Sequence, residues 1–163
     1  MSTAKKVILE LNIGDNAPIF DLPTDGSGNV SLQELRGKNV VLYFYPKDDT
    51  PGCTIEAKDF RDLKAEFENA NTVMIGVSKD SEEKHCKFIE KHSLNFTLAS
   101  DENGTTCEDY GVWVEKNMYG KKYMGIQRAT FLIDSEGKIA QIWPKVKVDG
   151  HAAEVLEAAK NIN

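Results

Sequence analysis

The sequence predicts a three-layer α/β fold in which helices flank a central mixed sheet. Two apolar runs of strand length, Val40–Tyr45 and Thr72–Ser78, enclose a helical pattern over residues 54–69. A strand, a helix and a second strand at this spacing predict a right-handed parallel crossover. Downstream, Ala129–Ile133 and residues 138–143 enclose the turn sequence DSEG, which predicts an antiparallel hairpin. Parallel and antiparallel pairs in one chain predict a mixed sheet.

The region before the crossover predicts an N-terminal β-hairpin packed beside the sheet. Residues 14–23 alternate weakly between apolar and polar, and residues 25–29 form a turn before the short segment 30–32. Residues 1–12 precede this hairpin. We expect them to form an N-terminal arm or an extra strand, the strand covering residues 7–11.

The helix expected over residues 54–69 has an apolar face with spacings of three, three and four, at Ala57, Phe60, Leu63 and Phe67. Three further helices are predicted: one capped by Asp80 or Ser81 and reaching about His92, a short one in GTTCEDYG that Gly111 stops, and an Ala-rich one from His151 to about Ile162. Residues 114–125 are polar and locally basic, and they predict a loop. Residues 97–99 are too short to assign.

Length and composition describe one ordinary globular domain over residues 1–163. The formal net charge of −6 argues against a nucleic-acid partner, because phosphate binding needs a basic face. No apolar run approaches the ~20 residues that span a bilayer, and the N-terminus lacks a signal-peptide core. Three cysteines are an odd number and do not form a secreted disulfide framework, so we expect a cytoplasmic protein.

Cys53 lies where the carboxyl end of the first core strand meets the first turn of a helix. Unpaired N–H groups and the helix dipole favour a negative charge there, so we expect Cys53 to be partly thiolate. Thr50 is positioned to aim its hydroxyl at the sulfur or at an oxygen approaching it, and Pro46 to wall off one side of the pocket. A lone cysteine is also commonly a small buried apolar residue. The position alone therefore leaves both interpretations open.

The pattern Pro46-x-x-x-Thr50-x-x-Cys53 resembles the active-site signature of the peroxiredoxins, which have a thioredoxin-like fold. The longer string YFYPKDDTPGCTIEA resembles the bacterioferritin comigratory protein, or peroxiredoxin Q, subfamily. Further blocks resemble that subfamily in the same order, namely GDNAPIFDLPTDG, LNFTLASDE, YGVW and IQRATFLIDSEGKI. The resemblance covers roughly residues 12–160, nearly the whole chain.

The resemblance implies a thiol-dependent peroxidase of antioxidant defence that reduces hydrogen peroxide and organic hydroperoxides. The Cys53 thiolate would attack the peroxide and become a sulfenic acid. Thr50 and the amides near Gly52 and Cys53 would orient the peroxide, and Arg128, in the IQR block, would supply the cation. From its position alone, Arg128 is equally well explained as a solvated residue at the end of a strand.

No metal or organic cofactor is expected. The Cys and His spacings do not resemble a zinc site, and no flavin or nicotinamide motif is present. The three histidines, His85, His92 and His151, are expected on helix surfaces and not as bases. Five neighbours of the motif receive structural roles: Glu56 as an acceptor of backbone or arginine hydrogen bonds, Trp113 and Tyr45 as packing residues, and Asp48 and Asp49 as solvent-facing turn residues.

The sequence departs from the subfamily at Lys58, where many members carry a resolving cysteine. Cys86 lies in the second crossover helix, where other members keep that thiol, although the usual place aligns with Ile89. The resemblance thus leaves two cycles open. In an atypical two-Cys cycle Cys86 pairs with Cys53, and in a one-Cys cycle an external thiol attacks the sulfenic acid. Cys107 is expected to be a buried structural thiol.

The resemblance implies thioredoxin, glutaredoxin or glutathione as the reductant, and a monomer. Two alternatives from other classes remain. One is a thioredoxin-fold binding or chaperone-like protein without turnover, because the usual resolving thiol is missing. The other is a thiol-disulfide oxidoreductase, which Cys53 disfavours because no second cysteine follows in a Cys-x-x-Cys spacing.

Overall fold

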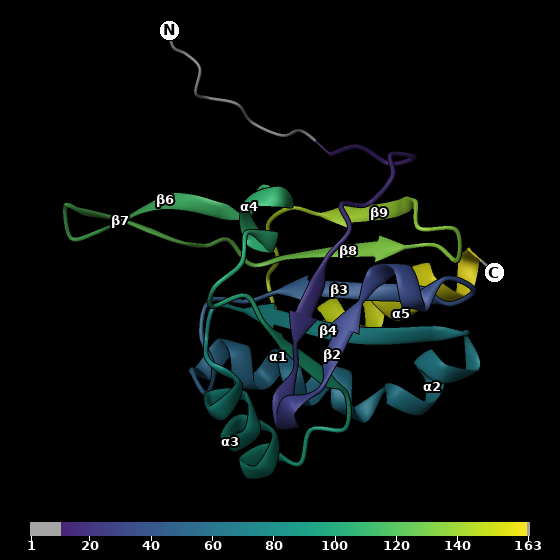
Figure 1. The fold of residues 1–163 in the computed structure, drawn as a ribbon, viewed down its shortest axis with the longest axis horizontal. Helices are drawn as coiled ribbons and strands as arrows, with labels where there is room; N and C mark the ends of the chain where they lie inside the picture. Colours follow the sequence, from purple (N-terminus) through teal and green to yellow (C-terminus); the bar gives the residue numbers. More distant parts are fainter. Residues whose placement is uncertain (1–10, 163) are drawn as a thin grey trace, which may run out of the picture.

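A computed structural model describes residues 11–162, so most of the expected N-terminal arm, residues 1–12, lies outside the described part. Its centre is a five-stranded mixed sheet in the order β5-β4-β3-β8-β9 (Figure 1). The strands are β3 (Asn39–Phe44), β4 (Thr72–Ser78), β5 (Thr97–Ser100), β8 (Ala129–Ile133) and β9 (Ile139–Trp143). β3, β4 and β5 are parallel neighbours, whereas β8 is antiparallel to both β3 and β9. The predicted mixed sheet is confirmed.

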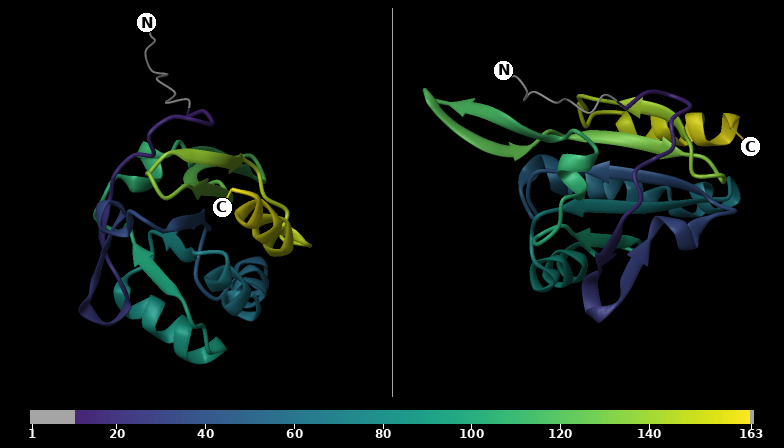
Figure 2. Two further views of the ribbon diagram at one scale, coloured as in Figure 1. Left: turned by 90° about the vertical axis from the view of Figure 1, so that its right-hand side faces the viewer. Right: turned by 45° about the horizontal axis from the view of Figure 1, so that its top comes forward.

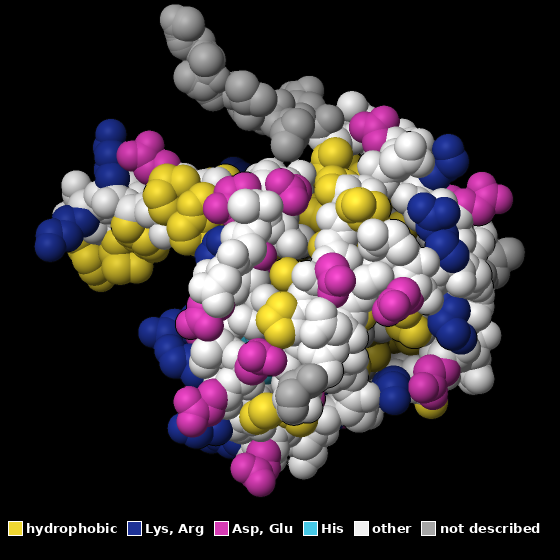
Figure 3. All heavy atoms as spheres, in the orientation of Figure 1, with side chains coloured by type: hydrophobic (Ala, Val, Ile, Leu, Met, Phe, Trp, Pro, Cys, Tyr) yellow, Lys and Arg dark blue, Asp and Glu magenta, His cyan; other side chains and the backbone are white. Residues whose placement is uncertain are grey.

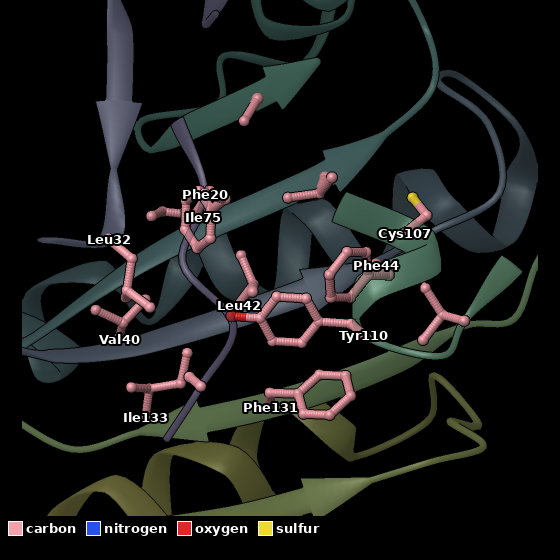
Figure 4. Packing of buried hydrophobic residues seen from close by; sticks show 14 of the residues in the cluster. Phe20, Leu32, Val40, Leu42, Phe44, Ile75, Cys107, Tyr110, Phe131 and Ile133 are labelled. Carbon is pink, nitrogen blue, oxygen red and sulfur yellow. The ribbon is translucent and has the colours of Figure 1, made fainter. Parts of the chain in front are cut away.

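Alternate residues of β3 pack into two different hydrophobic cores, because successive side chains of a strand point to opposite faces. Val40, Leu42 and Phe44 belong to the first core. Figure 4 shows the rings of Phe44, Tyr110 and Phe131 gathered there, with Leu42 beside them. The elements that contribute residues to this core from outside the sheet include β1 (Asp21–Pro23), β2 (Asn29–Ser31), η2 (Leu32–Leu35) and α4 (Thr106–Asp109), and η1 (Asp25–Ser27) lies between β1 and β2. The expected N-terminal hairpin is β1 paired with β2.

The second core lies on the opposite face of the sheet, under the longer helices (Figure 2). These helices are α1 (Pro51–Asp62), α2 (Lys64–Asn69), α3 (Glu82–His92) and α5 (His151–Asn161). Val41 and Tyr43 point into this core from β3, and Tyr45, the next residue after the strand, joins them. Gly76 on β4 leaves the space that the Tyr43 ring fills, since a Cβ at Gly76 would come within 2.9 Å of that ring. No helix in residues 11–162 is long and apolar enough to cross a membrane.

The helix expected over residues 54–69 is two helices, α1 and α2. The chain tightens at Leu63, where ψ is 8° and the backbone N–H bonds to the carbonyl three residues back at 3.1 Å. This i→i−3 bond ends one helix, and α2 begins at the next residue. The expected apolar face continues across the break, because Phe60 and Phe67 both lie in the second core.

The prediction of a loop over residues 114–125 is wrong. β6 (Trp113–Met118) and β7 (Lys121–Ile126) form an antiparallel hairpin that projects from the body (Figure 1). Its tip is a two-residue turn with positive φ at both positions, as tight hairpins require. Near the tip, both strands of the hairpin are exposed on both faces, so they lack the alternation of apolar and polar residues that marks a half-buried strand. Apolar side chains show on this hairpin in Figure 3, and the exposed ones are Met118, Tyr119, Tyr123 and Met124.

Candidate active site

Cys53 is the third residue of α1 and is 2% exposed. The helix begins at Pro51, whose fixed φ suits the first helical position, directly after the turn of residues 46–50 that ends β3. Thr50 is the N-cap residue, and its carbonyl accepts the Thr54 N–H at 2.8 Å. The N–H of Cys53 therefore lies in the first turn, where backbone donors have no partner within the helix. This is the position expected from the sequence.

Arg128 lies beside the sulfur although it is 75 residues away in the chain. β8 pairs antiparallel with β3 so that Ala129 is opposite Phe44, which brings Arg128 to the end of β3 from which the turn leads to α1. Its Nη2 is 3.4 Å from Cys53 Sγ. Burial disfavours its charge, but Cys53 and Glu56 outweigh that cost and raise the pKa of Arg128. The site holds a fixed positive charge against the thiol.

Glu56 holds the other side of the guanidinium. Its Oε1 accepts from Arg128 Nη1 at 2.7 Å, which confirms the arginine hydrogen bond expected of Glu56. The side chain is 1% exposed, and Oε2 has no hydrogen-bond partner within the described residues. Burial raises the pKa of Glu56 to about 7, although Arg128 opposes the shift. The carboxyl group is thus poised to change charge near neutral pH.

Gly52 allows the guanidinium to approach the first turn of α1. A Cβ at Gly52 would lie 3.1 Å from Arg128 Nη2, a tight contact that would press on the guanidinium. A glycine before Cys53 therefore leaves room for Arg128 beside the sulfur.

Thr50 does not donate to the sulfur. Its single hydroxyl proton goes to the Lys47 carbonyl at 2.8 Å, which leaves the lone pairs of Oγ1 to accept a hydrogen bond. Pro46 is exposed and lines a cavity of about 360 Å³ between the turn and the β6–β7 hairpin. Trp113, expected as a packing residue, lines the same cavity. Cys53, Thr50 and Arg128 are not among its lining residues, so the wall that Pro46 was expected to form beside the sulfur stays a prediction.

Lys116 on β6 is a second cation near the site, and no sequence motif selects it. It lines the same cavity as Pro46. Burial and the charge of Arg128 lower the pKa of Lys116, whereas Cys53 acts in the opposite direction. These influences place its ammonium group within the electrostatic reach of the Cys53–Arg128 pair. Only the hairpin, which the sequence did not predict, brings it there.

The other two cysteines have different surroundings. Cys86 is exposed on α3, whereas Cys107 is fully buried at the start of α4, as expected. All three cysteines are free thiols in the structure. Burial and the Asp101 carboxylate raise the pKa of Cys107 far above its ordinary value. The structure therefore does not bring Cys86 or Cys107 into contact with Cys53.

Two of the histidines expected on helix surfaces are buried, so that prediction is wrong for them. His85 is 0% and His151 4% exposed. The sequence spacing could have indicated that His85 is buried. His85 precedes Phe88 by three residues and Ile89 by four, and both of these side chains pack into the second core. His151 Nε2 lies 2.8 Å from Thr130 Oγ1, and burial lowers the pKa of His151 to about 4.

Asp48 does not face solvent, contrary to the prediction. Its side chain is 6% exposed and binds both Tyr45 Oη at 2.6 Å and His85 Nδ1 at 2.7 Å. Tyr45 is a buried packing residue, as expected, and also a donor. Asp49 is 43% exposed and fits the prediction better. No group of three or more His, Cys, Asp or Glu within residues 11–162 is arranged to hold a metal ion.

Comparison with known proteins gives consistent matches over most of the chain. Residues 13–142 match the pattern of the AhpC/TSA family. The chain is 57% identical over 148 residues to a Coxiella burnetii protein that carries the name bcp, covering 91% of this chain and 98% of that protein. It is 50% identical over 155 residues to the peroxiredoxin Bcp of Bacillus subtilis, covering 95% and 99% of the two chains.

Solved structures give the same match in three dimensions. A cysteine-to-serine mutant of Xylella fastidiosa PrxQ superposes with a TM-score of 0.89 at 39% identity, covering 94% of this chain and 98% of that one. The bacterioferritin comigratory protein of Xanthomonas campestris, whose structures were studied for its alkyl peroxide reduction activity, gives 0.84 at 45% identity over 88% and 91%. The thioredoxin-like fold expected from the sequence is confirmed.

Proposed function

Because the chain belongs to the AhpC/TSA family and is a peroxiredoxin of the Bcp, or peroxiredoxin Q, group, we propose that Cys53 is the nucleophile of its thiol-dependent peroxidase activity. The observation that carries this proposal is the 3.4 Å contact between Arg128 Nη2 and Cys53 Sγ at the first turn of α1. A thiolate is the nucleophilic form of cysteine, and a guanidinium and free helix amides both favour it. The chaperone-like and oxidoreductase alternatives gain no support from these relatives.

The reaction begins when the Cys53 thiolate attacks the terminal oxygen of a hydroperoxide. An S–O bond forms and the O–O bond breaks, so the sulfur loses two electrons and becomes a sulfenic acid. The other oxygen leaves as hydroxide or alkoxide and takes up a proton to give water or an alcohol. Negative charge thus moves from the sulfur to the leaving oxygen during the step.

Three features around Cys53 suit this movement of charge. The Arg128 guanidinium remains beside the reacting atoms and stabilises charge on either of them. The first-turn amides after Gly52 supply further donors, and the free lone pairs of Thr50 Oγ1 accept a hydrogen bond from the O–H of the peroxide. Pro46 bounds the approach from the cavity beneath the β6–β7 hairpin. These roles follow from the arrangement of donors, acceptors and charge.

We propose that the substrates are hydrogen peroxide and organic hydroperoxides, in a cytoplasmic monomer that serves antioxidant defence. The alkyl peroxide reduction named for the Xanthomonas campestris relative supports the organic substrates. Thioredoxin, glutaredoxin or glutathione would return the oxidised cysteine to the thiol. Each supplies a thiol whose sulfur displaces water from the sulfenic acid or exchanges with a disulfide.

We propose Cys86 as the resolving thiol, with the one-Cys cycle as the alternative. Cys86 is exposed on α3, and α3 is bound directly to the turn before Cys53 through the Asp48–His85 contact. Cys53 is 2% exposed, so the first turn of α1 must open before Cys86 can reach its sulfur. The resolving step therefore needs local unfolding of this part of the molecule.

Intact mass and disulfide mapping after one equivalent of hydrogen peroxide test this cycle on wild type and on Cys86→Ser. A loss of two hydrogens with a Cys53–Cys86 peptide, replaced in the variant by Cys53 sulfenic acid, is the expected result. Oxygen added at Cys53 in both proteins establishes the one-Cys cycle. If Cys53 gains no oxygen and forms no disulfide in either protein, the proposal that Cys53 is the nucleophile is wrong.

A further inference from the structure

A buried chain of hydrogen bonds joins the turn before Cys53 to α3, outside the group of residues that surrounds the sulfur. Tyr45 Oη donates to Asp48 Oδ1 at 2.6 Å, and Asp48 Oδ2 lies 2.7 Å from His85 Nδ1. His85 Nε2 lies 3.0 Å from the Ala99 carbonyl on β5. His85 is 0% exposed, so water does not replace any of these contacts. The attack of the thiolate on the peroxide uses none of these side chains directly.

The partners of His85 determine its protonation state. A carbonyl oxygen only accepts hydrogen bonds, so Nε2 must carry a hydrogen to bond Ala99. An ionised carboxylate also only accepts, so Nδ1 must carry a hydrogen to bond Asp48. With Asp48 ionised, His85 therefore makes both contacts only as an imidazolium. A neutral ring has one N–H and would lose one of the two contacts.

The same turn is tied to α3 at its exposed rim. Asp49 binds Lys91 Nζ at 2.8 Å and His92 Nε2 at 2.9 Å. Its φ of 62° is in the left-handed region, which residues other than glycine rarely adopt, so outside contacts must maintain it. The turn also contains Thr50 and leads directly into Cys53. Its conformation thus depends on α3, and His85 is the wholly buried member of that attachment.

We propose that His85 is a positioning residue for the peroxidase reaction: its doubly protonated ring holds the turn of residues 46–50 through Asp48, and loss of one ring proton ends this ion pair and loosens the turn. This inference rests on the proposed function of Cys53 and extends it to the control of the site. Its consequence is a peroxide reaction that weakens on the alkaline side while the protein remains folded. Small displacements of reacting groups have large effects, of about ten- to a hundredfold in rate.

The charges around His85 set the direction of this effect. Burial alone would lower the pKa of His85, but the hydrogen bond and charge of Asp48, with Asp80 further off, raise it above the ordinary 6.5. The ion pair is therefore complete below the ordinary 6.5 and is lost as the pH rises through the raised pKa of His85. Burial and Asp48 hold the pKa of Tyr45 well above 10, so Tyr45 stays neutral. The other charged groups line the adjacent cavity of about 230 Å³: Lys47, Asp49, Lys84, Lys87 and Lys91.

Two neighbouring substitutions form a matched test, Asp48→Asn and Asp49→Asn. Each removes one negative charge from the same turn, but only Asp48 contacts His85. Stopped-flow tryptophan fluorescence would measure the second-order rate constant for oxidation by hydrogen peroxide at roughly nine pH values from 5.5 to 9.5. In Asp48→Asn the alkaline fall should move to lower pH by about one to three pH units, because the ring loses its paired charge. In Asp49→Asn it should stay where wild type has it.

Nuclear magnetic resonance of the histidine rings supplies a readout that needs no substitution. In wild type, both His85 ring nitrogens should carry hydrogens at pH 6, and one hydrogen should be lost at the pH where the rate constant falls. A neutral ring at pH 6, a wild-type rate constant without an alkaline fall, or a fall that Asp48→Asn leaves in place would overturn the inference. If Asp48→Asn does not fold, the ring titration of wild type decides. Failure of the proposed function is distinct, because wild type would then show no peroxide-dependent oxidation of Cys53.

Discussion

The molecule contains two buried cysteines at helix starts, and their surroundings are opposite in charge. Cys53 is the third residue of α1 and Cys107 the second residue of α4, and they are 2% and 0% exposed. Arg128 Nη2 lies 3.4 Å from the sulfur of Cys53. Cys107 instead donates its backbone N–H to Asp101 Oδ2 at 2.8 Å, which fixes a carboxylate beside the thiol. A helix start alone does not make a reactive cysteine, because the nearest fixed charge decides whether a thiolate is stabilised.

The two carboxylates of these regions also differ. Both Asp101 oxygens accept backbone N–H groups, from Thr106 at 3.1 Å and from Cys107 at 2.8 Å. Glu56, by contrast, has one oxygen bound to Arg128 and one buried oxygen without a partner in residues 11–162. Asp101 is thus a satisfied structural acceptor, whereas Glu56 is held in a state that costs free energy.

The largest expected effect separates the two thiols directly. Cys53→Ser should reduce peroxide consumption with dithiothreitol as reductant by at least about 10³-fold, because the nucleophile is lost. Cys107→Ser should retain the wild-type rate, since burial and Asp101 keep that thiol protonated. A colorimetric assay of remaining hydrogen peroxide measures both. If Cys53→Ser still consumed peroxide at the wild-type rate, or if folded Cys107→Ser lost activity, the assignment of Cys53 as the reactive thiol and Cys107 as a structural one would be wrong.

The next effect tests the charge that distinguishes the two sites. Arg128→Ala should slow oxidation of Cys53 by about 10²-fold, because a preorganised donor to the reacting atoms is removed. Arg128→Lys should fall between wild type and Arg128→Ala, since an ammonium cannot bind the sulfur and Glu56 with the same planar fork. Stopped-flow oxidation by hydrogen peroxide gives the rate constants, and circular dichroism checks folding. If Arg128→Ala reacts with peroxide at the wild-type rate, Arg128 takes no part in the reaction.

The third prediction concerns Glu56 and the dependence of stability on pH, and it leaves the reaction rate aside. Its folded-state pKa of about 7 is above the ordinary 4.5, so the folded protein keeps a proton that the unfolded chain releases between these values. The free energy of unfolding of wild type should therefore decrease from pH 4.5 to 7, by up to about 3 kcal/mol from this group. Urea unfolding at pH 5 and pH 8 measures the change.

Glu56→Gln cannot titrate, so its free energy of unfolding should decrease less between pH 5 and pH 8 than that of wild type. The difference between the two decreases is the contribution of Glu56. Asp101→Asn is the matched substitution in the other region and should leave the Glu56-dependent decrease in place. Equal pH dependence in wild type and Glu56→Gln would show that Glu56 does not change charge in this range.

The elements that the sequence predicted correctly have local causes. The strand at residues 40–45, the turn and the helix that carries Cys53 follow from apolar runs, prolines and helical spacing within about 20 residues. The resemblance motif selected Cys53 and Arg128, which the structure brings together. The sequence did not predict the β6–β7 hairpin, because the parts of its strands near the tip are exposed on both faces. They therefore show no alternation of apolar and polar residues.

By itself, the sequence determined the order and type of most elements, the two-faced apolar pattern of the central strands, and the thiol at the start of a helix. These depend on neighbours in the chain. Only the tertiary structure decided which charges meet: Arg128 with Cys53 and Glu56, and His85 with Asp48. Such pairs join residues 37 to 75 positions apart, and their partners are fixed by strand register and helix packing. Burial then sets the sign and strength of each charge effect, and burial is a property of the assembled layers and not of any local stretch.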